Sequence, residues 1–409
     1  MSALTDRVID LDFDLAPAPQ PVPAFPHEPL SDPAAAKMNP KKLARAVALF
    51  RAQQASGRFP GGQLAVRRHG RLVVDEAVGM ARGFRAWEGE PAAPVRPDTR
   101  FCVFSAGKPL VALCIALLEE RGQLDVNAPI AEVFPEFGVR GKAAITPLDV
   151  LTHRGGILMP DFCRRPEEWG DWSRVVQAVI ETRPSLPRGT LAYHPFEYGW
   201  VLSEVVRRVS GRTVPQMVAD ELAGPMGLPS LRFGARKSEL RGLARSYWIG
   251  GKKTYIAGIE LSEPFEAINN SEAFLTAFIP GAGLVTDAAT LAAFYECLVA
   301  GGVTQGGRRL FAPGTIRRYT ERQFFGWDRS NRVPLAVGSG FLLGTRMPSA
   351  YGWLNSHECF GHAGAFCANA FADWRTGLSI AVVTNGNAGH TDVMGRLIPL
   401  SSALRAACE

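Results

Sequence analysis

The chain has 409 residues, of which 46% are hydrophobic, and it carries a formal net charge of +6. This length exceeds what one hydrophobic core usually serves, so it favours two domains, or one domain with a large insertion. The densest basic stretch, residues 236–245, also contains Glu239. It therefore indicates a solvated face rather than a surface that binds nucleic acid.

The cysteines and the first residues of the chain further restrict the class of protein that is expected. The seven cysteines are odd in number and include no C-x-x-C pair, so neither a disulfide framework nor a zinc site is expected. Residues 1–15 contain four aspartates and no basic and apolar leader pattern, and no apolar run approaches the roughly 20 residues that span a bilayer. Gly281-Ala282-Gly283 lacks the spacing of a phosphate loop. We expect a cytoplasmic protein without a cofactor, a metal or a membrane segment.

The first half of the chain begins with a proline-rich stretch. Residues 1–39 contain most of their prolines after residue 15, which favours an extended arm over a packed element. From residue 40 to about residue 57 the apolar positions follow one face of a helix, and residues 61–80 read as a strand pair. Residues 110–118 form an apolar helix that stops at Glu119-Glu120-Arg121-Gly122.

The second half is mainly helical until the chain nears its end. Helical periodicity dominates residues 145–300, with helices expected at residues 199–210 and 288–300. Strand patterns return only later, at residues 335–344, 368–373 and 378–384. A last helix is expected at residues 393–407. Strands from both ends predict one α/β sheet domain, residues 40–140 and 335–409. A mostly helical domain, residues 141–334, is expected to interrupt it, with the functional cleft between the two.

Ser105-Ala106-Gly107-Lys108 stands directly before the apolar helix. Residues three apart lie on one helical face, so the hydroxyl of Ser105 and the amine of Lys108 can meet. The start of a helix also favours a developing alkoxide. The pattern predicts a serine nucleophile with a lysine partner, and the alternative is a serine that only caps the helix.

Further short segments accompany this motif in a fixed order: Pro97-Asp98-Thr99-Arg100-Phe101, Thr146-Pro147-Leu148-Asp149, Pro187-Arg188-Gly189, Tyr193-His194, Gly224-Pro225-Met226-Gly227-Leu228 and Phe360-Gly361-His362-Ala363-Gly364. In this order they resemble the serine β-lactamase-like superfamily, more specifically its class C β-lactamase and family VIII carboxylesterase branch, over residues 40–400. The resemblance implies the β-lactamase/penicillin-binding-protein-like fold, an antiparallel sheet flanked by helices with an inserted mostly helical domain. It also implies an acyl-enzyme mechanism on the serine of S-x-x-K.

The resemblance assigns roles to several residues. Tyr193 corresponds to the tyrosine of the family's Y-x-N motif and is the third expected catalytic group. Whether Lys108 or Tyr193 takes the serine proton stays open, because coupled groups titrate as a set. The backbone N–H groups of Ser105 and Ala365 are expected to form the oxyanion hole.

The strand motif and its surroundings are expected to bind substrate, through His362, Gly364, Phe366 and Trp353. His362 could donate a hydrogen bond to Tyr193 or to the substrate, whereas the structural alternative is a histidine that holds a neighbouring carbonyl. His153 is expected to be a structural residue of a turn.

Two departures from the family pattern bear on the substrate. Pro195 replaces the asparagine of Y-x-N, and His362-Ala363 replace lysine and threonine. The side chains that would bind a substrate amide and a substrate carboxylate are therefore absent. A neutral ester has neither group, so its binding does not depend on them. The sequence predicts a carboxylesterase for small to medium acyl esters. Acyl transfer, β-lactamase or D-amino-acid peptidase activity, and a penicillin-binding sensor or scaffold without turnover are the alternatives, and the oligomeric state is not indicated.

Overall fold

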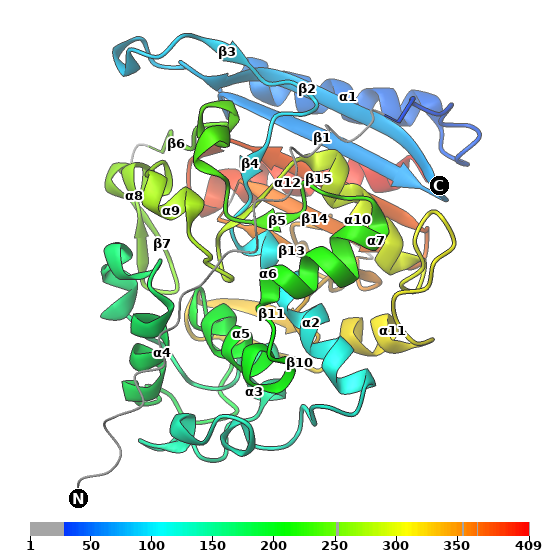
Figure 1. Cartoon of the computed structure of the whole chain (residues 1–409). Coiled ribbons are helices and arrows are strands. Elements are labelled where there is room, and N and C mark those ends of the chain that lie inside the picture. The colour runs from blue at the N-terminus through cyan, green and yellow to red at the C-terminus, as the bar shows by residue number, and fades with distance from the viewer. Residues whose placement is uncertain (1–27, 251–252, 354–355, 366, 409) are drawn as a thin grey trace, which may run out of the picture.

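The computed structural model describes residues 28–250, 253–353, 356–365 and 367–408. Most of the expected arm and Phe366 therefore lie outside the described residues. Within them, a large antiparallel sheet has the order β10-β11-β12-β13-β14-β15-β1-β2-β3 (Figure 1). Its strands are β1 (Gly61–Arg68), β2 (Arg71–Arg82), β3 (Ala93–Pro94), β10 (Phe324–Asp328), β11 (Val333–Val337), β12 (Leu342–Leu343), β13 (Cys359–Gly364), β14 (Ala368–Asp373) and β15 (Leu378–Thr384).

The two ends of the chain meet in the middle of this sheet. β1 pairs with β15 in a register that runs from Gly62 opposite Thr384 to Arg68 opposite Leu378. Side chains alternate between the faces of a strand, and both faces of β1 are buried. The strand patterns at the two ends of the sequence therefore predicted the fold correctly.

Two helices from the two ends of the chain cover one face of the sheet. α1 (Pro40–Ala55) packs against α12 (His390–Ala406), and the backbone N–H of Asn39 donates to the Ala407 carbonyl at 2.7 Å. Leu43, Phe50, Leu400 and Leu404 of these helices share a core with strand residues such as Val66 and Ile380. This core lies on one side of the sheet only.

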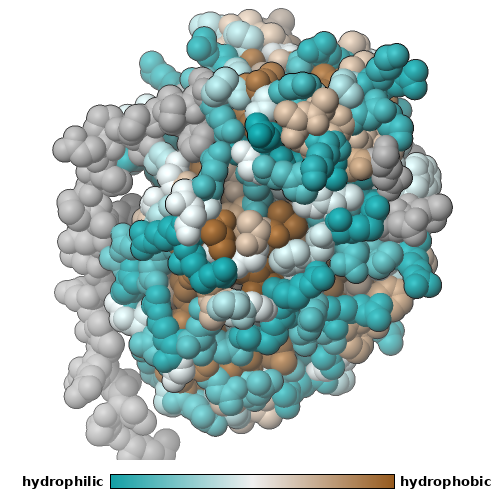
Figure 2. All heavy atoms as spheres, turned by 90° about the vertical axis from the view of Figure 1, so that its right-hand side faces the viewer, coloured by the Kyte–Doolittle hydropathy of each residue, from teal (hydrophilic) through white to brown (hydrophobic). Residues whose placement is uncertain are grey.

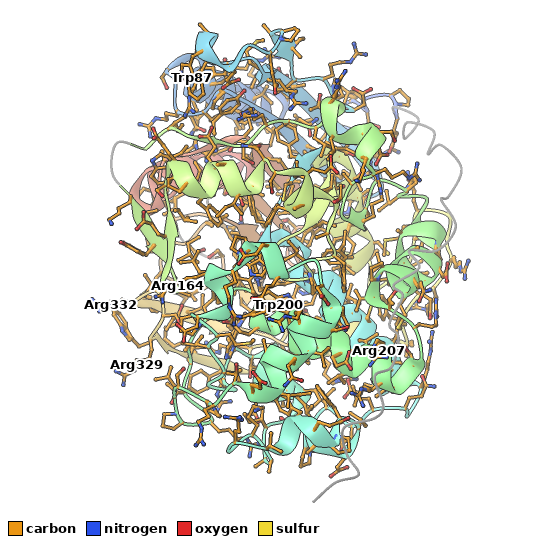
Figure 3. All side chains as sticks on the ribbon, turned by 60° about the vertical axis from the view of Figure 1, so that its left-hand side comes forward. Trp87, Arg164, Trp200, Arg207, Arg329 and Arg332 are labelled. Atoms are coloured by element: carbon orange, nitrogen blue, oxygen red, sulfur yellow. The ribbon has the colours of Figure 1, made fainter. Side chains whose placement is uncertain are left out.

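The other face carries the larger core. α10 (Ala288–Val299) packs on β1, β14 and β15, and α2 (Lys108–Glu120) packs against α5 (Glu197–Ser210). Every residue of α2 from Lys108 to Leu118 is buried, which is typical of a helix inside a large core. Trp200 of α5 lies in the interior (Figure 3), where it stacks on Phe196 with ring centroids 5.4 Å apart.

Shorter elements complete the helical side and the rim of the sheet. Their bounds are α3 (Pro147–Leu151), α4 (Trp172–Glu181), α6 (Val214–Met217), α7 (Gly224–Met226), α8 (Glu263–Asn269), α9 (Glu272–Thr276), α11 (Thr315–Thr320), β4 (Phe101–Cys102), β5 (Arg232–Phe233), β6 (Tyr247–Trp248), β7 (Thr254–Ile256), β8 (Ile259–Leu261), β9 (Leu284–Thr286) and β16 (Gly386–Asn387). β7 and β8 pair only with each other among the described residues. They form a separate hairpin beside the main sheet.

The helical region expected over residues 141–334 contains segments that join the sheet layer. β10 and the first two residues of β11 belong to strands of the sheet, and α10 covers it. Periodicity identified α10 as a helix, but an apolar stripe does not reveal which layer it will cover. The last helix begins at His390, earlier than the expected residue 393, because helix starts are poorly marked in sequence.

The surface is mainly polar, as expected for a chain that buries most of its apolar side chains. The face drawn in Figure 2 is mainly hydrophilic, with a smaller hydrophobic group near its middle. Within the residues that the structure describes, no helix combines the length and the apolar character needed to cross a membrane.

Candidate active site

Ser105 lies at a sharp turn between a short strand and the central helix. Phe104 has φ 49° and ψ −130°, a conformation that non-glycine residues rarely adopt and that costs free energy. A short 3-10 turn, Ser105–Gly107, follows and runs directly into α2. The turn presents the Ser105 side chain to a pocket of about 410 Å³.

Lys108 lies one turn further along and is completely buried. Its Nζ is 2.9 Å from Ser105 Oγ, 2.6 Å from the Pro195 carbonyl oxygen and 2.9 Å from the Gly281 carbonyl oxygen. Burial lowers the pKa of Lys108 to about 7, and the charge of Glu197 opposes this shift. Nζ donates to Oγ and to both carbonyls, and the Ser105 hydroxyl donates to the Gly281 carbonyl oxygen at 3.2 Å. After losing a proton, the amine keeps two N–H groups for the carbonyls and gains a lone pair that can accept the hydroxyl proton. The geometry therefore suits a lysine that accepts the serine proton.

Pro195 and Gly281 act through their backbone carbonyls, and sequence reasoning gave them no such part. The type of a residue does not reveal what its backbone carbonyl contacts, although Gly281 has a reason to lack a side chain. A Cβ at position 281 would lie 2.6 Å from the Pro195 carbonyl oxygen. Only glycine lets the two carbonyls come together around one amine.

Tyr193 completes the group around Ser105. The Lys108 Nζ lies 5.0 Å from the centre of the Tyr193 ring. Burial raises the pKa of the Tyr193 phenol, while a hydrogen bond with Ser105 acts in the opposite direction. The phenol therefore holds its proton at neutral pH.

Asp328 is a further site residue that the sequence did not reveal. It is fully buried, and its Oδ1 accepts the backbone N–H of Tyr193 at 2.9 Å. Its Oδ2 accepts the side-chain amide of Asn331 at 2.8 Å. An aspartate 135 positions away in sequence thus fixes the backbone of the tyrosine, and no short-range pattern could have indicated it.

The end of β13 lies directly against the turn that holds Ser105. A Cβ on Gly364 would lie 1.9 Å from the Val103 carbonyl oxygen, so no larger residue allows this approach. Ala365 follows with φ 37° and lines the pocket. Within the described part of the chain, neither the Ser105 nor the Ala365 backbone N–H donates to a protein acceptor. Two free amides beside a nucleophile are the donors that an oxyanion hole needs.

His362 faces the same pocket as a neutral ring. Burial lowers its pKa to about 3, and the charge of Lys108 adds to the effect. Its Nδ1 lies 2.7 Å from the Ala363 carbonyl oxygen, which can only accept, so Nδ1 carries the proton. The buried Nε2 has no partner among the described residues. In this tautomer Nε2 can accept a hydrogen bond but not donate one, which favours the structural alternative, a histidine that holds a neighbouring carbonyl.

The structure separates the other expected substrate residues from this pocket. Gly364 packs on Val103 and is absent from the pocket lining among the described residues. Trp353 is 53% exposed, and its backbone N–H donates to Ser402 of α12. The segment before β13 places Trp353 against α12, and Trp353 is not among the described lining residues of the pocket. Phe366 lies outside the described residues.

The pocket walls are largely apolar. They come from β7, β8, α8 and the β11 and β12 region, with Ile256, Leu261, Phe265, Leu335 and Leu342 among the lining residues. Asp328 is the one charged residue among the described lining residues, and no lysine or arginine is included. The β7 and β8 wall was missed in sequence, although Ala257-Gly258 between two short apolar segments is a hairpin signal.

The Beta-lactamase family model matches residues 46–400 of the chain. The chain belongs to the β-lactamase family. Its fold and its class, a serine hydrolase of the β-lactamase fold, follow from this membership, and the resemblance in the ordered motifs is confirmed.

Relatives of this β-lactamase family member cover almost its whole length. It is 29% identical to "Esterase/beta-lactamase LipL" of Mycobacterium tuberculosis, over 84% of this chain and 81% of the relative. It is 28% identical to "Esterase EstB" of Burkholderia gladioli, over 92% and 97%. A solved "family VIII carboxylesterase" has the same fold, with a TM-score of 0.76, 24% identity and coverage of 93% and 99%.

The described side chains were compared with what a metal site or a reactive cysteine would require. Among the described residues, no group of three histidine, cysteine, aspartate or glutamate side chains could hold a metal ion. Cys102, Cys114, Cys163, Cys297, Cys359 and Cys367 are buried, and burial raises the pKa of Cys102, close to the nucleophile, to about 12.

Proposed function

We propose that this chain is a carboxylesterase that hydrolyses small to medium acyl esters through an acyl-enzyme on Ser105. The observation that carries the proposal is the 2.9 Å contact between Ser105 Oγ and the buried Lys108 Nζ, at the edge of a pocket without a cation among its described lining residues. An amine with a lowered pKa can be neutral near pH 7 and take the serine proton.

The reaction proceeds in two halves. Lys108 accepts the Ser105 proton while Oγ attacks the ester carbonyl, and the N–H groups of Ser105 and Ala365 stabilise the tetrahedral oxyanion. Tyr193 donates its proton to the leaving alkoxide as the C–O bond breaks, and it recovers a proton from Lys108. Water then attacks the acyl-enzyme by the same proton route and releases the acid.

Charge around the pocket favours an ester over a β-lactam or a peptide that carries a carboxylate. His362 is neutral, and Asp328 is the charged group in the described lining. Arg329 and Arg332 follow Asp328 in sequence, but they extend outward from the rim (Figure 3) and are not among the lining residues described. The esterase names of LipL and EstB support the same choice. The first of these names also makes β-lactam hydrolysis the second candidate.

Turnover of short p-nitrophenyl esters tests the proposal. The native protein should release p-nitrophenol from the acetate and butyrate, and Ser105→Ala should lose at least about a thousandfold in kcat. Ser173→Ala, on the exposed side of α4, is the matched control and should keep the native rate. An acyl mass shift on Ser105 after brief exposure to ester identifies the intermediate. Unchanged ester turnover in Ser105→Ala, or nitrocefin turnover faster than ester turnover, would contradict the esterase.

A further inference from the structure

A second and larger cavity adjoins the pocket that contains Ser105. It has a volume of about 760 Å³, within the range of about 300–1,000 Å³ that is typical of small-molecule sites. Pro195, Tyr255, Ile259 and Phe265 line both cavities. Ser105, Lys108 and Tyr193 do not line the second cavity, so the catalytic groups do not account for it.

The two cavities share a wall. It consists of the β7 and β8 hairpin and the start of α8, at the left of Figure 1 above α4. A two-stranded hairpin without further strands is marginally stable by itself. Its turn is held from the catalytic side, where the backbone N–H of Ala257 donates to Asn331 Oδ1 at 2.9 Å. The hairpin and the start of α8 therefore form a wall that the two cavities share.

The second cavity is lined mainly by apolar side chains. Leu158, Trp169, Phe265 and Ile268 are examples, from the loop before α4 and from α8. Ile268 and Phe265 are half-buried, so part of their apolar surface is left for a ligand. Burying a methylene group is worth about 0.8 kcal/mol, which corresponds to roughly a fourfold gain in affinity for each methylene bound.

The charged groups of this cavity already have partners. Arg164 pairs with Asp161 at 3.4 Å, and Glu260 pairs with Lys253 at 3.2 Å. Glu197 is buried, and its Oε1 accepts the backbone N–H of Met159 at 2.7 Å. No charge in the described lining is left without an opposite charge or a hydrogen bond, so an ionic ligand would gain little there.

We propose that this cavity is a second subsite that binds an extended apolar chain of the ester, which passes the β7 and β8 hairpin from the catalytic pocket. The subsite rests on the proposed esterase function, and it extends the substrate class to esters with chains of about eight carbons or more. The chain can belong to the acyl group or to the alcohol, since both are alkyl in character. Filling the cavity should therefore change chain-length preference in one of two ester series.

Ile268→Trp is the test variant, because this side chain lines the second cavity and not the first. Ala267→Trp, at the neighbouring exposed position of α8, is the matched control. The kcat/KM of each protein is measured for p-nitrophenyl esters from acetate to dodecanoate, and for alkyl acetates from ethyl to dodecyl. The ratio of dodecyl-chain to short-chain kcat/KM should fall at least tenfold in Ile268→Trp in one series. The series in which it falls shows whether the acyl group or the alcohol occupies the second cavity. Ala267→Trp should keep the native ratio in both.

A second variant and a binding measurement keep the test independent of folding and of turnover. Leu158→Trp fills the cavity from a different segment of its lining and should lower the same ratio. Dodecyl-dansylamide, titrated by fluorescence into Ser105→Ala protein, should bind, and Ile268→Trp in that background should weaken its binding at least tenfold. Ratios within twofold of native in both tryptophan variants, or unchanged dansylamide binding, would overturn the subsite. Absence of turnover for every ester, with dansylamide binding intact, would overturn the esterase function alone.

Discussion

At the scale of the residue, the chemistry depends on a buried lysine rather than on the serine motif alone. Lys108 contacts two carbonyls and one hydroxyl, and burial lowers its pKa to about 7. Tyr193 has a raised pKa, so the two groups divide the tasks of base and acid. For the question that the sequence left open, the two pKa shifts favour the lysine, and we propose Lys108 as the general base.

The first prediction is a pH profile. Because the base must be neutral, kcat/KM should fall about tenfold per pH unit below a midpoint near 7 and level off above it. Stopped-flow or steady-state rates from pH 5 to 9 measure the midpoint. His362→Asn should retain it, since His362 is already neutral. A midpoint that disappears in His362→Asn would assign the titration to the histidine.

The second prediction concerns Glu197, whose charge raises the pKa of Lys108. Glu197→Gln removes that charge and keeps the shape, so the midpoint of kcat/KM should move to lower pH. Glu204→Gln, on the same helix but paired with Arg207 at 2.7 Å, is the control and should leave the midpoint in place. A midpoint that stays or rises in Glu197→Gln would contradict the electrostatic account.

At the scale of the element, the site forms where four segments meet. The turn at Ser105 comes from the start of α2, Tyr193 lies before α5, Gly281 lies before β9, and β13 brings Ala365. The contact between β13 and the Ser105 turn is the tightest of these, because it leaves no space for a Cβ at Gly364. Local packing of two backbones thus positions both proposed oxyanion donors.

The third prediction is that Gly364→Ala lowers kcat without unfolding the protein. The new methyl group would lie 1.9 Å from the Val103 carbonyl oxygen, so β13 must move away and weaken one donor. Loss of one oxyanion donor typically costs about 10²–10³ in kcat. Gly242→Ala, where a Cβ meets nothing within 4 Å, is the control. Near-native kcat in Gly364→Ala would contradict this function of the close approach.

At the scale of the whole molecule, the sheet separates two cores with different tasks. The larger core surrounds α2 and carries the site, whereas α1 and α12 seal the other face. The seal depends on residues from both chain ends, which are joined by the pairing of β1 with β15. The smaller core under α1 and α12 is therefore separated from the site by the sheet.

The fourth prediction follows from this separation. Leu400→Ala removes a fully buried side chain of α12 and should lower the free energy of unfolding by about 2–5 kcal/mol. The kcat of the folded protein should stay within about twofold of native, since the site lies across the sheet. Leu30→Ala, at a leucine that is 59% exposed, should change stability by less than about 0.5 kcal/mol. Urea unfolding measures the free energy of unfolding of each variant, and ester turnover measures its kcat. A loss of kcat in Leu400→Ala as large as that of Gly364→Ala would contradict the separation of this core from the site.

The sequence by itself determined the elements and the chemistry-bearing side chains that short-range patterns encode. The S-x-x-K helix, the hairpin at residues 61–80 and the strands near the end of the chain depend on periodicity, and Tyr193 and His362 on motif order. Only the tertiary structure decided the groups that act by position. The carbonyls of Pro195 and Gly281 reach Lys108, and the carboxylate of Asp328 reaches Tyr193, from segments that are distant in sequence. Trp353 illustrates the same limit, because nearness in sequence did not bring it to the pocket. Residue type determines which protons and hydrogen bonds a side chain can offer. Its burial and its neighbours determine its pKa and its partners, and these depend on the tertiary structure.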